Sequence, residues 1–174
     1  PMVVGEGFSK SRGTAGPALP DGQCRPLGGD AAGGAGGDNS PMKIIRLKPG
    51  KERSLQRRHP WVFDGAIAKG GADAGETVRV DSADGQFLAW GAYSPQSKIR
   101  VRAWSFDQAQ RIDAPFFHDT LRRAIALRER MGIASNGQRL VHGESDGLPG
   151  LVVDRYDDTL VAQFGAAGVE RWKD

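Results

Sequence analysis

Cysteine is almost missing from this sequence, because Cys24 is the only one among its 174 residues. A single thiol cannot form a disulfide within the chain, and it cannot build a cysteine-based metal cluster, so both kinds of covalent or metal cross-link are excluded within the chain. This scarcity is typical of a reducing compartment, and it predicts a cytoplasmic location.

Long apolar runs are missing as well. No stretch approaches the roughly 20 apolar residues that span a bilayer, which predicts a soluble protein with no membrane partner. The chain does not begin with a basic segment that leads into an apolar stretch of about 7–15 residues, so its start is not a secretory signal.

The motifs of common enzymes are a third absence. The sequence has no G-x-G-x-x-G after an expected strand, no P-loop, no nucleophile elbow and no H-E-x-x-H pair. We therefore predict no catalytic residue, no cofactor-binding residue and no metal ligand within the chain.

Glycine and proline, by contrast, are concentrated at the start of the chain. The first 42 residues hold 11 of the 25 glycines and 5 of the 10 prolines, and their longest apolar run is Met2-Val3-Val4. Such a segment cannot bury enough apolar surface to offset the entropy lost on ordering. We predict a disordered head over 1–41. Because the composition turns globular at Met42, we interpret this head as an upstream extension or a leader.

Positive charge is concentrated in the middle of the chain. Residues 43–114 carry 13 basic against 8 acidic side chains, whereas the segments before and after them are close to neutral. Lysine and arginine gain by displacing counterions from phosphates, so this asymmetry indicates a polyanionic partner. The alternative is a charged surface that serves only solubility.

From Met42 onward, apolar and polar residues alternate with the two-residue period of half-buried strands. An Asp-Gly turn at 84–85 joins two of these runs as a hairpin, and further glycines mark other tight connections. Several short strands joined by glycine-rich turns predict a small β-barrel over 43–114. The predicted strands are 43–48, 76–81, 86–93 and 98–105.

The two-residue period gives way to a helical one at Asp113. The Asp113 side chain can cap a helix that accepts Pro115 in its first turn, and Gly132 can end it. We interpret the arginines of this helix as a solvated face in preference to an RNA contact. These arginines are Arg122, Arg123, Arg128 and Arg130.

Three further strands follow the helix, at 139–142, 151–156 and 159–164, around a turn rich in glycine and proline. A helical spacing then begins at 166 and has no room to finish before Asp174. We therefore predict an α+β fold in which the barrel is followed by an incomplete strand-helix-strand central domain over 115–174.

The densest basic stretch runs from Lys51 to Phe63. Its cationic side chains precede the aromatic pair Trp61 and Phe63, a mixture that can hold phosphates while a base or ribose stacks. The alternative is a short surface helix ended by Pro60, with the aromatic pair pinning it to the barrel, and for Trp61 we favour a place in the core. The cations predicted to bind RNA are Lys51, Arg53, Arg57 and Arg58.

Lys98, Arg100 and Arg102 are a second candidate for RNA binding. Strand geometry places every other side chain on one face, so these three would form a track for a phosphate backbone. The alternative is an edge strand that uses charge to avoid aggregation.

Glu144 and Asp146 lie near a turn, where two carboxylates could share a proton. The surrounding glycines and a proline favour a structural turn instead. With His142 beside them a metal-dependent hydrolase is conceivable, although one histidine and two acids are a weak ligand set.

Four blocks of the sequence resemble the bacterial class I large-subunit (23S) ribosomal RNA (cytosine-5) methyltransferases. Their order and spacing agree with that family, so the resemblance spans about 43–174 and does not touch the head. The blocks are Lys51–Phe63 with Arg57-Arg58-His59-Pro60-Trp61-Val62-Phe63 at its centre, Leu88–Pro95 with Ser97–Arg102, Asp113–Arg123, and Gly143–Gly150 with Val153-Asp154-Arg155.

This resemblance implies three parts: a PUA-type barrel that binds RNA, a central strand-helix-strand domain, and a C-terminal Rossmann-like domain that binds S-adenosylmethionine. The barrel would match 43–114, and most of the central domain would match 115–174. The third part, with its cofactor loop and catalytic cysteine, has no counterpart here. The resemblance therefore implies S-adenosylmethionine in the full-length family, no cofactor in this chain, and an inactive chain when alone.

Together, these features predict the RNA-binding portion of a 23S ribosomal RNA 5-methylcytosine methyltransferase, with ribosomal RNA as its partner and a methyltransferase domain missing from the chain. Two alternatives stay open. The chain is either a stand-alone RNA-binding adaptor or the remnant of a truncated reading frame.

Overall fold

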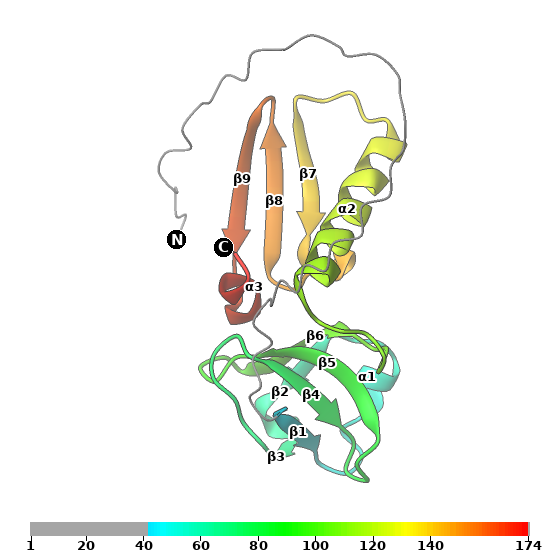
Figure 1. The fold of residues 1–174 in the computed structure, drawn as a ribbon, viewed down its shortest axis with the longest axis vertical. Coiled ribbons are helices and arrows are strands. Elements are labelled where there is room, and N and C mark those ends of the chain that lie inside the picture. The colour runs from blue at the N-terminus through cyan, green and yellow to red at the C-terminus, as the bar shows by residue number, and fades with distance from the viewer. Residues whose placement is uncertain (1–41, 174) are drawn as a thin grey trace, which may run out of the picture. The chain divides into compact units, whose positions relative to one another are not determined.

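The computed structural model describes residues 42–173, which lie in one compact unit and contain two β-sheets (Figure 1). Strands dominate, and two of the three α-helices have only four or five residues. The α+β fold class predicted from the sequence is confirmed. The disordered head predicted over 1–41 lies outside the described residues.

The first sheet consists of six short strands, accompanied by one helical turn and one 3-10 turn: β1 (Ile44–Leu47), α1 (Arg53–Gln56), β2 (Trp61–Phe63), η1 (Asp64–Ala66), β3 (Ile67–Lys69), β4 (Thr77–Asp81), β5 (Phe87–Tyr93) and β6 (Ile99–Ser105). The strand order is β2-β6-β5-β4-β1-β3. All neighbours are antiparallel except β1 and β4, which run parallel.

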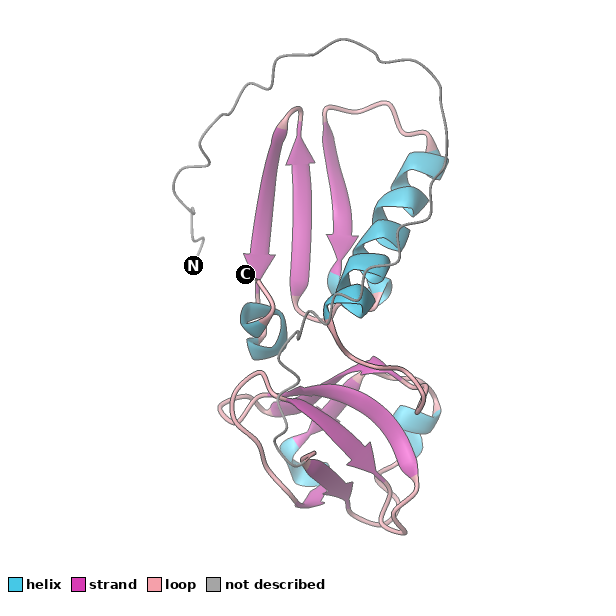
Figure 2. Ribbon diagram, in the orientation of Figure 1, coloured by secondary structure: helices cyan, strands magenta, loops and turns pink. Residues whose placement is uncertain are grey.

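This sheet curls into a small barrel because a tight turn joins its two edge strands. β2 and β3 lie at opposite ends of the strand order, yet only η1 separates them along the chain. The step from Phe63 to Ile67 spans about 14 Å at most, so the two edges stay close together. β2 and β3 do not pair with each other, so within residues 42–173 the barrel is open at that seam. Figure 2 shows its strands bent around one interior.

The alternating apolar residues of these strands build the core of the barrel. Ile45 on β1, Val78 and Val80 on β4, Ala89 on β5 and Val101 on β6 have 0% exposed surface. Each buried valine or isoleucine contributes about 1.5–3 kcal/mol relative to an exposed one. The two-residue period of the sequence therefore corresponds to the inward and outward faces of the barrel.

Strands β1, β4, β5 and β6 lie where the sequence predicts them, and the hairpin around Asp84-Gly85 is confirmed by the antiparallel pairing of β4 with β5. Two strands, β2 and β3, are not predicted, because three residues are too few to show an alternation. The alternative of an edge strand for 98–105 is wrong, since β6 pairs with β2 on one side and with β5 on the other.

Helix α2 (Ala114–Met131) begins and ends as predicted. The Asp113 carboxylate accepts a hydrogen bond from the backbone N–H of Phe116 at 3.2 Å, and Pro115 occupies the first turn. Gly132 ends the helix with a φ of 61°, a conformation that costs glycine little.

The second sheet has three antiparallel strands that follow α2, with a 3-10 turn after the first strand and a short helix at the end: β7 (Gly137–His142), η2 (Gly143–Asp146), β8 (Leu151–Tyr156), β9 (Thr159–Phe164) and α3 (Ala167–Arg171). The strand order is β7-β8-β9, and α2 packs against β7. The predicted sequence of one helix followed by three strands is therefore present.

A second apolar core lies between α2, this sheet and α3. Ala124 of α2, Val141 of β7, Leu148 after η2 and Val169 of α3 are all buried in it. The outer strand β9 contributes nothing to this core, because all six of its residues are exposed. Within the described residues, none of the helices is long and apolar enough to cross a membrane.

Candidate nucleic-acid interface

Helix α1 presents one apolar side chain inward and cationic side chains outward. Leu55 is 2% exposed and joins the core of the barrel. Lys51, Arg53, Arg57 and Arg58 are exposed, and we call these four residues the α1 cation cluster. Arg53 lies within α1, whereas Lys51, Arg57 and Arg58 flank it, and Leu55 is the only buried residue among 51–58.

The cations of this cluster keep their charge available. Among residues 42–173, no carboxylate lies within ion-pair distance of Lys51, Arg53, Arg57 or Arg58. Exposed lysine and arginine side chains that lack an acidic neighbour can approach phosphates without first breaking an ion pair. The structure therefore leaves every member of the first predicted set of RNA-binding residues exposed in or beside α1.

Arg58 differs from the other members of the cluster in its backbone. Its φ of 60° is unusual for a residue with a side chain, and it closes α1 through a hydrogen bond from its N–H to the Leu55 carbonyl at 2.8 Å. Its guanidinium lies 5.6 Å from the centre of the Phe106 ring. Arg58 therefore has a structural role as well as a charge, whereas Arg53 and Arg57 have only exposed side chains.

The second predicted set is less uniform. Arg100 Nε donates to Asp64 Oδ1 at 2.7 Å, and Arg100 Nη1 donates to the Pro95 carbonyl, so much of its charge is already compensated. Arg102 is half-buried, whereas Lys98 is exposed. The alternation in β6 agrees with the sequence. However, the middle cation of the row, Arg100, is already paired with Asp64, a contact that the sequence does not reveal.

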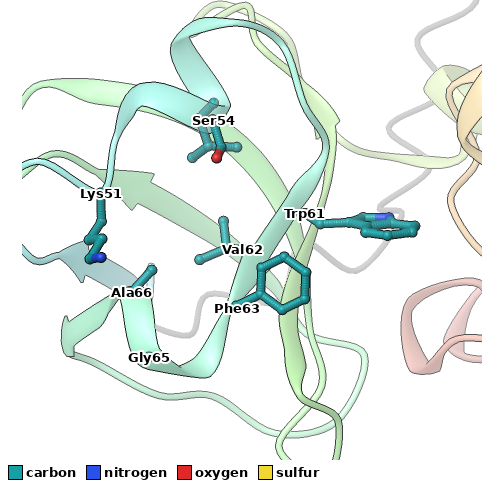
Figure 3. A pocket seen from close by; sticks show the side chains of 8 residues that line it. Lys51, Ser54, Trp61, Val62, Phe63, Gly65 and Ala66 are labelled. Carbon is teal, nitrogen blue, oxygen red and sulfur yellow. The ribbon is translucent and has the colours of Figure 1, made fainter.

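A hollow of about 330 Å³ lies beside α1, between α1, β2 and η1 (Figure 3). Leu55 and Val62, 2% and 3% exposed, provide its apolar floor. Lys51 and Phe63 stand on opposite sides of it in Figure 3, with Ser54 above them. Phe63 is 50% exposed, so its ring is accessible from solvent.

The two aromatic residues of β2 have different surroundings. Trp61 is half-buried, and its indole N–H donates to Glu144 Oε1 at 2.8 Å, so it does not fill the barrel core as we favoured from the sequence. The Phe63 ring meets the Trp61 ring edge-on, with centroids 6.4 Å apart. The two rings of β2 therefore differ: Phe63 is exposed to solvent, whereas Trp61 is hydrogen-bonded to η2.

The turn that holds Glu144 and Asp146 is structural, as predicted. Arg128 donates to both oxygens of Asp146, at 2.6 and 2.7 Å, and the His142 backbone N–H donates to the same carboxylate at 2.6 Å. The interpretation of Arg128 as part of a solvated face is wrong, because its side chain is only 14% exposed and is held by this pair. Among residues 42–173 there is no group of three potential metal ligands.

Two opposing influences act on the pKa of Asp146. Burial is the largest single one and raises the pKa, since a carboxylate loses its hydration there. The hydrogen bonds from Arg128 and from the His142 backbone outweigh burial, so the pKa lies below the ordinary value for aspartate. Asp146 is therefore an ionised structural anchor and not an acid that could donate a proton at neutral pH.

Residues 45–106 match the family model described as a PUA-like domain. This part of the chain is a PUA-like domain. The match covers the six-stranded sheet and includes the α1 cation cluster, the hollow and the row from Lys98 to Arg102. The barrel implied by the resemblance is thus confirmed as PUA-like.

Curated relatives extend the likeness beyond the PUA-like domain. The chain is 50% identical over 137 residues to "Ribosomal RNA large subunit methyltransferase I" of Shewanella denitrificans, and 48% identical over 137 and 136 residues to the proteins of that name from Shewanella frigidimarina and Aliivibrio fischeri. The family resemblance predicted from the four sequence blocks is confirmed. Each match covers 75% of this chain but 34% of the relative, so the chain spans about a third of the relatives' length.

Solved structures support the same fold. A candidate SAM-dependent methyltransferase from Streptococcus mutans has a TM-score of 0.67 with this chain at 17% identity, over 76% of this chain and 35% of the other. A candidate methyltransferase complexed with SAH gives the same TM-score, identity and coverage. At this identity the likeness shows the fold of the PUA-like domain and the following sheet, and nothing about their activity.

The described residues do not form a site that fits S-adenosylmethionine, the cofactor that the family resemblance implies. Such cofactors use an open, glycine-rich turn between a strand and a helix. The turn after β9 leads into the first turn of α3, which is filled by packing, since a Cβ on Gly168 within α3 would lie 2.7 Å from Trp104 Cζ2 and closer still to the Ala92 Cβ. We therefore assign no step of methyl transfer to residues 42–173.

Proposed function

We propose that this chain binds ribosomal RNA through its PUA-like domain and is the RNA-binding portion of a SAM-dependent 23S ribosomal RNA 5-methylcytosine methyltransferase. Methyl transfer itself belongs, in this proposal, to a domain outside the chain, which corresponds to the remaining two-thirds of the relatives. The observation that carries the proposal is the α1 cation cluster, four exposed cations without carboxylate partners among the described residues, within a domain whose relatives are named as ribosomal RNA methyltransferases.

Within this proposal, the α1 cation cluster makes the main phosphate contacts. Lys98, just before β6, and Arg102 on β6 extend the contact, and Arg100 joins them only if its pair with Asp64 opens. Phosphate contacts position an RNA without reading its sequence, so the choice of the modified nucleotide is left to the domain outside this chain.

The test is binding of the full chain to 23S ribosomal RNA fragments over a range of salt concentrations. Each phosphate contact contributes about 0.7–0.9 to the slope of log affinity against log salt, so the double variant Arg53→Ala, Arg57→Ala should weaken binding and flatten the slope by about 1–2. We choose Arg53 and Arg57 over Arg58, because Arg58 also packs on Phe106.

A matched control removes the same charge elsewhere. Arg122 and Arg130 are exposed on α2, and the variant Arg122→Ala, Arg130→Ala should keep both affinity and slope. Wild-type affinity that is negligible or independent of salt would overturn the proposal of RNA binding. Equal losses in the two double variants would overturn the assignment to the α1 cation cluster.

A further inference from the structure

We propose that the hollow beside Phe63 receives one unpaired nucleobase of the RNA, whose backbone phosphate binds Lys51. This inference rests on the proposed RNA-binding function and adds a ligand class to it: single-stranded nucleotides in preference to paired ones. It concerns a place on the PUA-like domain that the charge pattern alone does not single out.

The walls of the hollow match the parts of a nucleotide. A nucleobase is flat and largely apolar on its faces, and it stacks on exposed aromatic rings. Phe63 supplies such a ring at 50% exposure, above the apolar floor of Leu55 and Val62. A volume of about 330 Å³ is at the low end for ligand sites, so it suits a single base and not a larger group.

The opposite side of the hollow carries the polar groups that a nucleotide needs. Lys51 lies across from Phe63, and Ser54 lies between them at the upper edge (Figure 3). Neither the Lys51 ammonium nor the Ser54 hydroxyl has a hydrogen-bond partner among residues 42–173. A cation for phosphate and a hydroxyl for ribose or base therefore face an aromatic ring across one small hollow.

The position of β2 keeps this hollow open to an incoming strand of RNA. β2 is an edge strand that pairs with β6 alone, and its register shifts between Val62 and Phe63. Such bulges re-aim a side chain at a sheet edge. Trp61, the other aromatic residue of β2, is held by Glu144, which leaves Phe63 as the ring available for stacking.

An unpaired base is favoured over a duplex for a physical reason. In a paired helix the faces of the bases are covered by their neighbours in the stack, so Phe63 could reach a base only after unstacking it, at a cost of a few kcal/mol. An unpaired nucleotide already exposes its base and needs no such step.

The experiment compares the full chain with the Phe63→Ala variant in binding a short single-stranded RNA and a fully paired duplex of the same length. Loss of one stacked base should weaken single-strand binding by about 5- to 100-fold, with little change for the duplex. Phe63→Tyr, which keeps the ring, should restore single-strand binding. Tyr156→Ala removes a similarly exposed ring from β8 and should have no effect on either RNA.

The outcomes separate this inference from the function on which it rests. If the wild-type chain binds neither RNA, both are overturned together. If the wild-type chain binds RNA with the expected salt dependence and Phe63→Ala binds the single strand equally well, only the inference is overturned. Parallel losses on single strand and duplex, with an unchanged thermal unfolding curve, would likewise overturn the preference for unpaired nucleotides.

Discussion

At the scale of single residues, the same kind of side chain serves different purposes in this molecule. Arg57 is exposed and has no carboxylate near it among residues 42–173, whereas Arg128 is held by both oxygens of Asp146. The difference comes from what lies opposite each arginine in space. Arg57 faces solvent at the end of α1, and Arg128 faces η2 across the second core.

Asp146→Asn should destabilise the fold by about 3 kcal/mol, because it leaves the largely buried guanidinium of Arg128 without its counter-charge. The pKa of Asp146 is lowered in the folded chain, so the stabilisation is complete above the ordinary aspartate value of about 3.9 and is lost as pH falls through the folded pKa. Urea unfolding of wild type and variant, measured from pH 7 down to pH 2, should show their difference shrinking with acid.

The control for this measurement is Asp84→Asn, since Asp84 is exposed in the β4–β5 turn. It should cost less than about 0.5 kcal/mol at any pH. A difference between wild type and Asp146→Asn that stays constant down to pH 2 would show that the ion pair is not the source of the stability.

At the scale of elements, short segments are held in place by very close packing. Helix α3 has only five residues and would not be stable in isolation. It lies against β5 and the end of β6, where Gly168 leaves just enough room for Ala92 and Trp104. The Trp104 ring in turn meets Phe117 of α2 edge-on, with centroids 4.9 Å apart.

Gly168→Ala should lower the free energy of unfolding by about 1–3 kcal/mol, because the added methyl group overlaps the Ala92 side chain and the Trp104 ring. Gly71→Ala is the matched control: Gly71 is exposed in a loop, and the nearest atom to an added Cβ is the Tyr93 hydroxyl at 3.8 Å. Thermal unfolding of both variants measures the effect. Equal stabilities would mean that α3 is not packed as described.

At the scale of the whole molecule, contacts between distant parts of the sequence join the two sheets. The bond from Trp61 to Glu144 links β2 with η2, and the packing of Gly168 links α3 with β5. Each contact connects the PUA-like domain with the residues that follow it. The described residues therefore have two apolar cores, and contacts join the two parts of the chain that contain them.

We expect this unit to unfold in a single transition in urea, because loss of either sheet exposes apolar surface of the other. Tryptophan fluorescence and far-UV circular dichroism should then give the same midpoint. Trp61→Phe keeps an aromatic ring but removes the hydrogen bond to Glu144, so it should lower both midpoints together, by an amount that corresponds to about 0.5–1.5 kcal/mol in the free energy of unfolding. Two separate midpoints in the wild-type chain would contradict the expectation.

Much of this architecture follows from local sequence. The alternation in β1, β4, β5 and β6 reflects a physical period of two residues, and α2 is bounded by a capping aspartate and a terminal glycine that act within a few residues of themselves. The α1 cation cluster is also visible in the sequence, because a run of cations around one apolar residue is exposed wherever it lies. The family likeness is carried by the same local blocks and is confirmed by the relatives.

Only the tertiary structure decides which of these groups are available. It pairs Arg100 with Asp64 and Arg128 with Asp146, ties Trp61 to Glu144, and leaves Phe63 beside a hollow. Each of these outcomes depends on a partner 18 or more residues away or on the meeting of three elements. Local sequence determines where strands, caps and charges lie along the chain, whereas long-range packing determines which charges are neutralised and which surfaces stay open.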